Sequence, residues 1–119
     1  MSMRRVDKPW GFEIIWAQTD RYVGKVLHIH AGHRLSRQYH RTKEETLLLQ
    51  SGEMDLEIGP AGAIEVRRMA KGDVFHVVPG TIHRMIAVTD VEVVEVSTPE
   101  LDDVVRLEDV YGREGTSEP

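Results

Sequence analysis

The sequence predicts an all-β fold in which short strands close into a barrel or a two-layered sandwich. Short runs rich in Val, Ile, Thr and aromatic residues follow one another along the chain. Gly, Pro, Asp and Lys-Gly turns separate these runs at hairpin spacing. Eight or nine strands arranged in this way would also leave no exposed sheet edges. The 119 residues are enough for one modest core and too few for two.

Eight segments are predicted to be strands because apolar residues alternate with polar ones, or cluster, between turn signals. In chain order they are residues 11–17, 22–29, 47–50, 53–58, 63–69, 74–78, 83–88 and 91–97. The alternation is cleanest in 53–58, where Met54 and Leu56 share one face and acidic residues share the other. Trp16 and Phe75 are predicted to be core residues.

The last predicted strand, "VEVVEVS" at 91–97, carries valines on both faces, which predicts that both faces are covered. A dimer interface would cover the second face. A second sheet layer of the same barrel is the alternative.

The pattern changes after Thr98. Pro99 and the acidic residues behind it would suit the first turn of a short helix, with Thr98 as its N-cap. Extended packing across the barrel is the alternative. We therefore expect a single domain over 1–119, with a core of about 10–98, a C-terminal extension at 99–113 and a frayed tail at 114–119.

Composition narrows the function classes. The net charge is −5, which argues against a general nucleic-acid binder. No apolar run approaches the roughly 20 residues that span a bilayer, and "MSMRRVDKPWG" has no apolar stretch typical of a signal peptide. The absence of cysteine fits a reducing compartment, so we expect a cytoplasmic location and no membrane partner.

The stretch "LSRQYHRTKEETLLLQSG" raises the question of a metal site. If it is extended, Gln38 and His40 point the same way, and Glu45 follows as the next strand begins. His83 opens a later strand. Two imidazoles, a carboxylate and an amide oxygen would suit Zn, Mn, Fe, Co or Ni. Spacing alone leaves open whether these side chains meet or decorate a loop.

The spacing of glycines, histidines and Glu45 resembles the two motifs of the cupin superfamily. Gly32, Gln38-x-His40, Glu45 and Gly52 match the first motif, with glutamine in place of its first histidine; Gly72, Val78-x-Gly80 and His83 match the second, with Val78 and Ala87 replacing the usual Pro and Asn. "KPWG", "KVLHIHAGHRLSRQYH", "PGTIHR" and "DDVVRLEDVYGR" are similar in order and spacing to the isomerase domain of type II mannose-6-phosphate isomerases.

This resemblance implies a cupin-type double-stranded β-helix, or jelly roll, in which one divalent metal serves aldose–ketose isomerisation of a phosphorylated sugar. The metal expected first is zinc, with Mn, Fe, Co or Ni as alternatives. The implied metal ligands are Gln38, His40, Glu45 and His83. Isomerisation also needs a base, and the catalytic candidates are Glu44, Lys25 and His33. The substrate-binding candidates are Arg84, Lys43, His28 and His30.

Several alternatives stay open. Arg37, Arg41 and Lys43 have the opposite parity to Gln38 and His40, which favours a solvated rim over phosphate binding. His28 and His30 lie either near the metal or on a strand face without a role. The protein is expected to be a homodimer that binds a small molecule. Other possible functions are an oxygenase or lyase acting on a non-sugar substrate, and a non-catalytic binding module.

Overall fold

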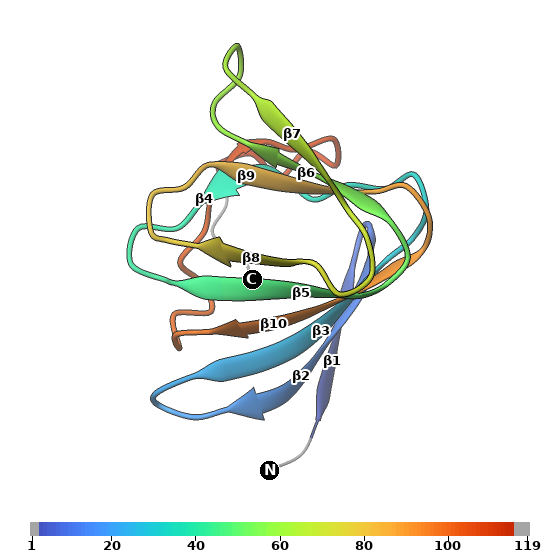
Figure 1. Ribbon diagram of the computed structural model, residues 1–119. Helices are drawn as coiled ribbons and strands as arrows, with labels where there is room; N and C mark the ends of the chain where they lie inside the picture. The colour runs from blue at the N-terminus through green and yellow to red at the C-terminus, as the bar shows by residue number, and fades with distance from the viewer. Residues whose placement is uncertain (1–2, 116–119) are drawn as a thin grey trace.

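The computed structural model describes residues 3–115 and shows two antiparallel sheets that lie face to face (Figure 1). The six-stranded sheet has the order β1 (Arg4–Lys8), β2 (Gly11–Gln18), β3 (Val23–Ile29), β10 (Val91–Ser97), β5 (Glu45–Ser51), β8 (Val74–Val77). The five-stranded sheet has the order β11 (Val105–Glu108), β4 (Arg37–Tyr39), β9 (His83–Ala87), β6 (Met54–Ile58), β7 (Glu65–Met69). The predicted all-β double-stranded β-helix is confirmed.

All eight predicted strands are present, and three more strands bring the described total to eleven. The additional strands are β1, β4 and β11. Each of them is short or carries few apolar residues, so its strand character comes from the neighbour to which it pairs. Among residues 3–115 no helix is both long and apolar enough to cross a membrane.

The core fills the space between the two sheets. Leu27 and Ile29 of β3 are 2% and 0% exposed, and Met54 and Leu56 of β6 face them from the other sheet with 0% exposure each. The predicted alternation of β6 is therefore confirmed. Each such side chain contributes about 1.5–3 kcal/mol of hydrophobic stabilisation. The polar side chains that share these inward faces form the candidate site.

The C-terminal extension is extended, and the alternative of a helix after Thr98 was wrong. Short turns lead from Pro99 to Val104, and β11 then pairs with β4. This pairing brings the extension next to the segment that carries Gln38 and His40. Of the predicted frayed tail, residues 116–119 lie outside the described part of the chain.

The outer face of the six-stranded sheet carries a continuous apolar row. Successive register partners across five strands form it: Ile14, Val26, Val94, Leu48 and Val74. Beside the row, Trp16 is 44% exposed and lies over Gly24. Val96 is 49% exposed. The prediction of Trp16 as a core residue was wrong, because Ile15 and Ala17 take the inward positions of β2. A second layer of the same barrel does not cover β10 within the described residues.

Candidate metal centre

His40, Glu45 and His83 meet inside the barrel. Their ligand atoms all lie within 4.8 Å of one another, and the residues are 2%, 3% and 1% exposed. His40 follows the end of β4, Glu45 begins β5 and His83 begins β9. Gln38 is the direct register partner of His83, so its side chain starts on the same face of the sheet. Strands β4, β5 and β9 therefore bring these side chains together.

Hydrogen bonds determine which ring nitrogen of each histidine faces the cluster. His40 Nδ1 lies 2.6 Å from the main-chain oxygen of Asp103, and His83 Nδ1 lies 2.9 Å from that of Thr81. A carbonyl oxygen can only accept, so both Nδ1 atoms carry hydrogen and donate it. This leaves the Nε2 lone pairs of neutral rings directed at Glu45, 2.9 Å and 3.3 Å from its Oε1.

This arrangement fits a bound cation. Lone pairs of two neutral imidazoles and a carboxylate oxygen repel one another unless a proton or a metal ion lies between them. His83 Nε2 is also a buried nitrogen without a hydrogen-bond partner. Metal-binding histidines commonly donate the other ring N–H to a carbonyl in this way. His40, Glu45 and His83 would hold the ion, and it would supply Lewis-acid chemistry.

Gln38 lines the same cavity as His40 and Glu45. Its Oε1 accepts a hydrogen bond from Ser36 Oγ at 2.6 Å. Ser36 is fully buried, so this contact fixes the direction of the amide. An amide oxygen has two lone pairs, which leaves one for an ion beside His83.

Glu45 is held in its charged form. Its burial raises the pKa, but the neighbouring His40 and His83 side chains and the charge of Lys43 outweigh burial and hold the pKa well below its usual range. Lys43 Nζ lies 3.5 Å from Glu45 Oε2 and 3.3 Å from Glu95 Oε2. Burial lowers the pKa of Lys43, yet the two carboxylates outweigh it and raise the pKa.

A network of alternating charges continues from Lys43 along the barrel interior. Glu95 is also 3.9 Å from Lys25, and Lys25 is 3.4 Å from Glu13. Burial, followed by the charge of Glu45, raises the pKa of Glu95. Burial lowers the pKa of Lys8, which lies 4.0 Å from Glu13 at the end of the network.

The network, together with His40 and Glu45, lines one cavity with a volume of about 50 Å³. Its walls carry five cationic side chains and three carboxylates: Lys8, Lys25, Lys43, Arg106, Arg113, Glu13, Glu45 and Glu95. Leu101 and Val104 of the C-terminal extension also line it. Arg113 is ion-paired with Asp109 at 2.8 Å, and the three lysines alternate with the three glutamates along the cavity wall.

Asp103 fixes the loop between His40 and Glu45. Its carboxylate accepts the main-chain N–H groups of Arg41, Thr42 and Lys43 at 3.1, 2.7 and 2.8 Å. Burial raises the pKa of Asp103, but these three N–H groups outweigh it and lower the pKa. The C-terminal extension thus holds the loop that carries two of the proposed ligands.

Comparison with known families identifies the chain at this point. Residues 25–98 match the cupin domain. The chain belongs to the cupin family. No curated protein was found to match it.

Solved structures share the cupin fold at low identity. CapF of Staphylococcus aureus, a capsular polysaccharide assembling protein, has a TM-score of 0.74 and 20% identity; the match covers 92% of this chain and 33% of CapF. This cupin thus spans about a third of CapF. KdgF of Halomonas sp. has a TM-score of 0.69 and 22% identity, with 87% of this chain and 92% of KdgF covered.

Oxalate decarboxylase of Bacillus subtilis, a protein with Mn(II) centres, has a TM-score of 0.69 and 13% identity. The match covers 82% of this cupin and 27% of that chain. None of these three is named a mannose-6-phosphate isomerase, so the cupin part of the predicted resemblance is confirmed and the isomerase branch stays a proposal. At these identities the likeness shows the fold alone.

Two of the predicted catalytic and substrate-binding residues lie inside the barrel of this cupin. Lys25 and Lys43 are 6% and 4% exposed and line the cavity. The interpretation of Lys43 as part of a solvated rim was wrong. The alternation of side chains seen at Gln38 does not continue to Lys43, because β4 ends at Tyr39 and the chain turns before β5 begins at Glu45.

The other predicted residues lie outside the cavity. The side chain of Glu44 is half exposed and hydrogen-bonds to His76. His33 Nδ1 lies 2.8 Å from the hydroxyl of Tyr111. Arg84 is buried and donates to the main-chain oxygen of Leu35 at 2.9 Å. His28 and His30 lie together on the outer face of β3, away from the core positions of that strand.

Sequence reasoning missed Glu13, Glu95 and Asp103. The alternation of β10 contained the signal for Glu95, which shares the inward face with Val91 and Val93. Glu13 likewise shares its face with Ile15. No local pattern marks Asp103, because its role depends on loop N–H groups about sixty residues away.

Proposed function

We propose that this cupin is a metal-dependent enzyme acting on a small anionic substrate with a carbonyl group. Within that class, isomerisation of a sugar phosphate such as mannose 6-phosphate is the reaction to test first. The observation that supports the proposal is the His40–Glu45–His83 cluster, because His40 and Glu45 line a cavity that three lysines also line. A divalent ion bound there would polarise a carbonyl oxygen.

The side chains of the network fit the remaining requirements of aldose–ketose isomerisation. That reaction moves a proton between neighbouring carbon atoms and therefore needs a carboxylate or amine in the cavity. We propose Glu95 for this role, because it lies between Lys43 and Lys25 and is not one of the proposed metal ligands. The two lysines would orient an anionic substrate and hold Glu95 in place. Zinc is the first metal expected, because a mixed N/O ligand set suits it.

A direct assay tests this proposal. The protein is stripped with a chelator, reloaded separately with Zn²⁺, Mn²⁺, Co²⁺, Ni²⁺ and Fe²⁺, and incubated with mannose 6-phosphate while fructose 6-phosphate is measured. We expect turnover that needs the metal. Glu95→Gln should lose at least about a hundredfold of the rate, whereas the matched surface variant Glu44→Gln should retain it. Tight binding of the sugar phosphate without product would instead identify a binding module.

A second candidate function is supported by the size of the cavity. A volume of about 50 Å³ holds only a few water molecules, so a small carboxylate fits it more readily than a hexose phosphate. Oxalate decarboxylase shares the fold, which makes a lyase or oxygenase acting on a small acid the alternative. Oxygen uptake by the iron-loaded protein, and carbon dioxide release by the manganese-loaded protein with oxalate, would support this alternative over isomerisation.

We also propose that the protein forms a homodimer through the outer face of its six-stranded sheet. The apolar row across five strands, together with the exposed Trp16 and Val96, is the type of surface that partner chains cover. Light scattering of the wild-type protein should give twice the chain mass, and Val94→Glu should give a monomer. Val66→Glu, at an exposed valine of the other sheet, is the matched control and should stay dimeric. A monomeric wild type would refute the proposal.

A further inference from the structure

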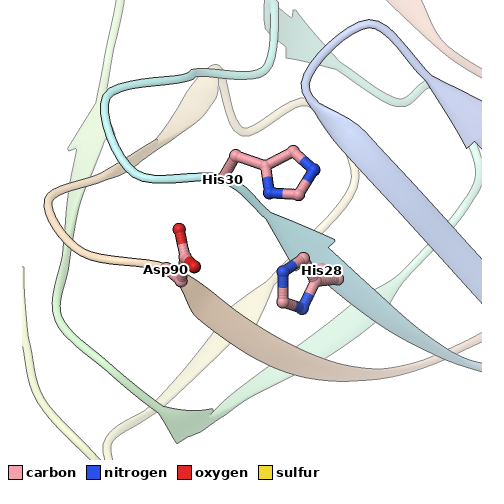
Figure 2. Close-up of side chains that lie close together, drawn as sticks. All are labelled: His28, His30 and Asp90. Atoms are coloured by element: carbon pink, nitrogen blue, oxygen red, sulfur yellow. The ribbon is translucent and has the colours of Figure 1, made fainter.

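A second group of metal-ligating side chains lies on the outside of the barrel. His28 ends the outward-facing positions of β3, and His30 follows two residues later on the same side. The intervening Ile29 and the preceding Leu27 fill the core, so the two histidines are separated from the interior cluster by packed side chains. Figure 2 shows Asp90, on the turn before β10, facing both rings. The ligand atoms of the three residues lie within 4.8 Å of one another.

The carboxylate of Asp90 is fixed in direction. Its Oδ1 accepts the main-chain N–H of Ala31 at 2.7 Å, which links the turn between β9 and β10 to the end of β3. That bond uses one oxygen and turns the other toward the histidines. Across the sheet, Glu92 Oε1 lies 3.6 Å from His28 Nδ1 and adds a second carboxylate to the group.

The ring of His28 is also held in place, and that of His30 lies against it. His28 stacks on Phe12 with ring centroids 4.9 Å apart and planes 8° apart, and His30 meets His28 edge-on at 5.1 Å. The main-chain N–H of His30 donates to Trp10 at 3.0 Å. Arg5 lies over the far side of Phe12, where its ion pair with Asp7 at 2.9 Å balances its charge.

We propose that His28, His30 and Asp90 form a second, surface-exposed site for a divalent transition-metal ion. Ligand atoms around tetrahedral zinc lie about 3.3 Å apart, given bonds of about 2.0–2.1 Å. Rotation of the exposed His30 side chain closes the remaining distance. Two imidazoles and a carboxylate suit Zn²⁺, Ni²⁺ and Cu²⁺, and water completes the coordination because the site faces solvent. The inference is independent of the function proposed for the barrel site.

Zinc binding to the chelator-stripped full chain tests this proposal, with Zn²⁺ alone as the probe and equilibrium dialysis as the measurement. His30→Gln should bind one zinc ion fewer per chain than the wild type. Asp90→Asn keeps the oxygen that accepts the N–H of Ala31 and removes the negative charge. It should therefore weaken the binding of that same zinc ion at least about tenfold. His40→Ala, which removes a ligand of the barrel cluster, should retain it.

The control is His76→Gln, at an exposed histidine that pairs with Glu44 elsewhere on the same sheet. It should bind as much zinc as the wild type. In nuclear magnetic resonance spectra, Zn²⁺ added to the His40→Ala protein should shift the imidazole signals of His28 and His30 before those of His76. If His30→Gln and Asp90→Asn bind zinc with the wild-type stoichiometry and affinity, the second site does not exist.

Discussion

Replacing Asp103 by alanine tests whether the C-terminal extension holds the metal centre together. The carboxylate accepts three consecutive main-chain N–H groups of the loop that joins His40 to Glu45. The main-chain oxygen of Asp103, which accepts from His40 Nδ1, remains in the variant. Asp103→Ala therefore removes the support of the loop while leaving every proposed metal ligand in the chain.

The expected cost follows from the three lost hydrogen bonds. A hydrogen bond to a charged group contributes about 1.5–3 kcal/mol net when it is shielded from water. Arg41 and Thr42 are exposed, so their N–H groups can bind water instead, whereas Lys43 is buried. We expect Asp103→Ala to lower the free energy of unfolding by about 2 kcal/mol, which corresponds to a decrease in Tm of about 8 °C for a domain of this size. A loosened ligand loop should also weaken zinc binding about 10–100-fold.

Thermal unfolding of the metal-free protein and a zinc competition titration measure the two effects. Asp102→Ala is the matched control, because Asp102 is exposed and its carboxylate takes no part in these bonds. Asp103→Asn keeps one oxygen acceptor and should fall between the two alanine variants. If Asp103→Ala matches Asp102→Ala in both Tm and zinc affinity, the extension does not support the centre and the reasoning is refuted.

Three further predictions concern buried charge, backbone strain and pH. Lys43→Met removes the cation that bridges the buried carboxylates of Glu45 and Glu95, so urea unfolding of the metal-free protein should show a loss of about 3–5 kcal/mol. A loss no larger than that of the exposed Lys71→Met would contradict this. Gly52→Ala should lower the Tm more than Gly72→Ala does. Both glycines have positive φ (+84° and +94°), but of the two only at Gly52 would the new Cβ lie 2.2 Å from a main-chain oxygen. Equal decreases in Tm would contradict this steric explanation. The folded-state pKa of Asp103 is below its value of about 3.9 in an unfolded chain, so its stabilisation is present above that pH and is lost as the pH falls. Asp103→Ala should thus differ from the wild type in urea unfolding at pH 6, and a difference that persisted at pH 2 would contradict this assignment.

The alternation of apolar and polar residues predicted the strands that have one face in the core and one in solvent. It did not predict strands that form only because they pair with a neighbouring strand. Met54 and Leu56 were placed correctly because period-two hydrophobicity needs only local sequence. The segment Arg4–Lys8 has a single apolar residue, and only the register with β2 makes it a strand. Trp16 was misplaced in the core. It lies between Ile15 and Ala17, which point inward, so its own side chain points outward.

The spacing of the glycines and histidines predicted part of the candidate site. That spacing picked out His40, Glu45 and His83, which the fold brings together. It could not reveal the charge network, because Lys43 and Glu95 come from distant parts of the chain and meet only through the pairing of β10 with β5. Lone charged residues within a strand read locally as solvent-facing, and the paired ion that makes their burial possible lies elsewhere in the sequence.

The burial of the Lys–Glu network should give the two proposed metal sites different responses to ionic strength. Dissolved salt screens charges that face water, with a Debye length of about 8 Å at physiological concentration, and it screens buried pairs much less. Glu13, Glu95 and Lys43 are at most 4% exposed, so the electrostatic potential inside the barrel should change little between low and high salt concentrations. His30 and Asp90 are exposed to solvent, so salt would screen the charges of the proposed outer site. Added salt should therefore weaken zinc binding more at the outer site than at the interior site.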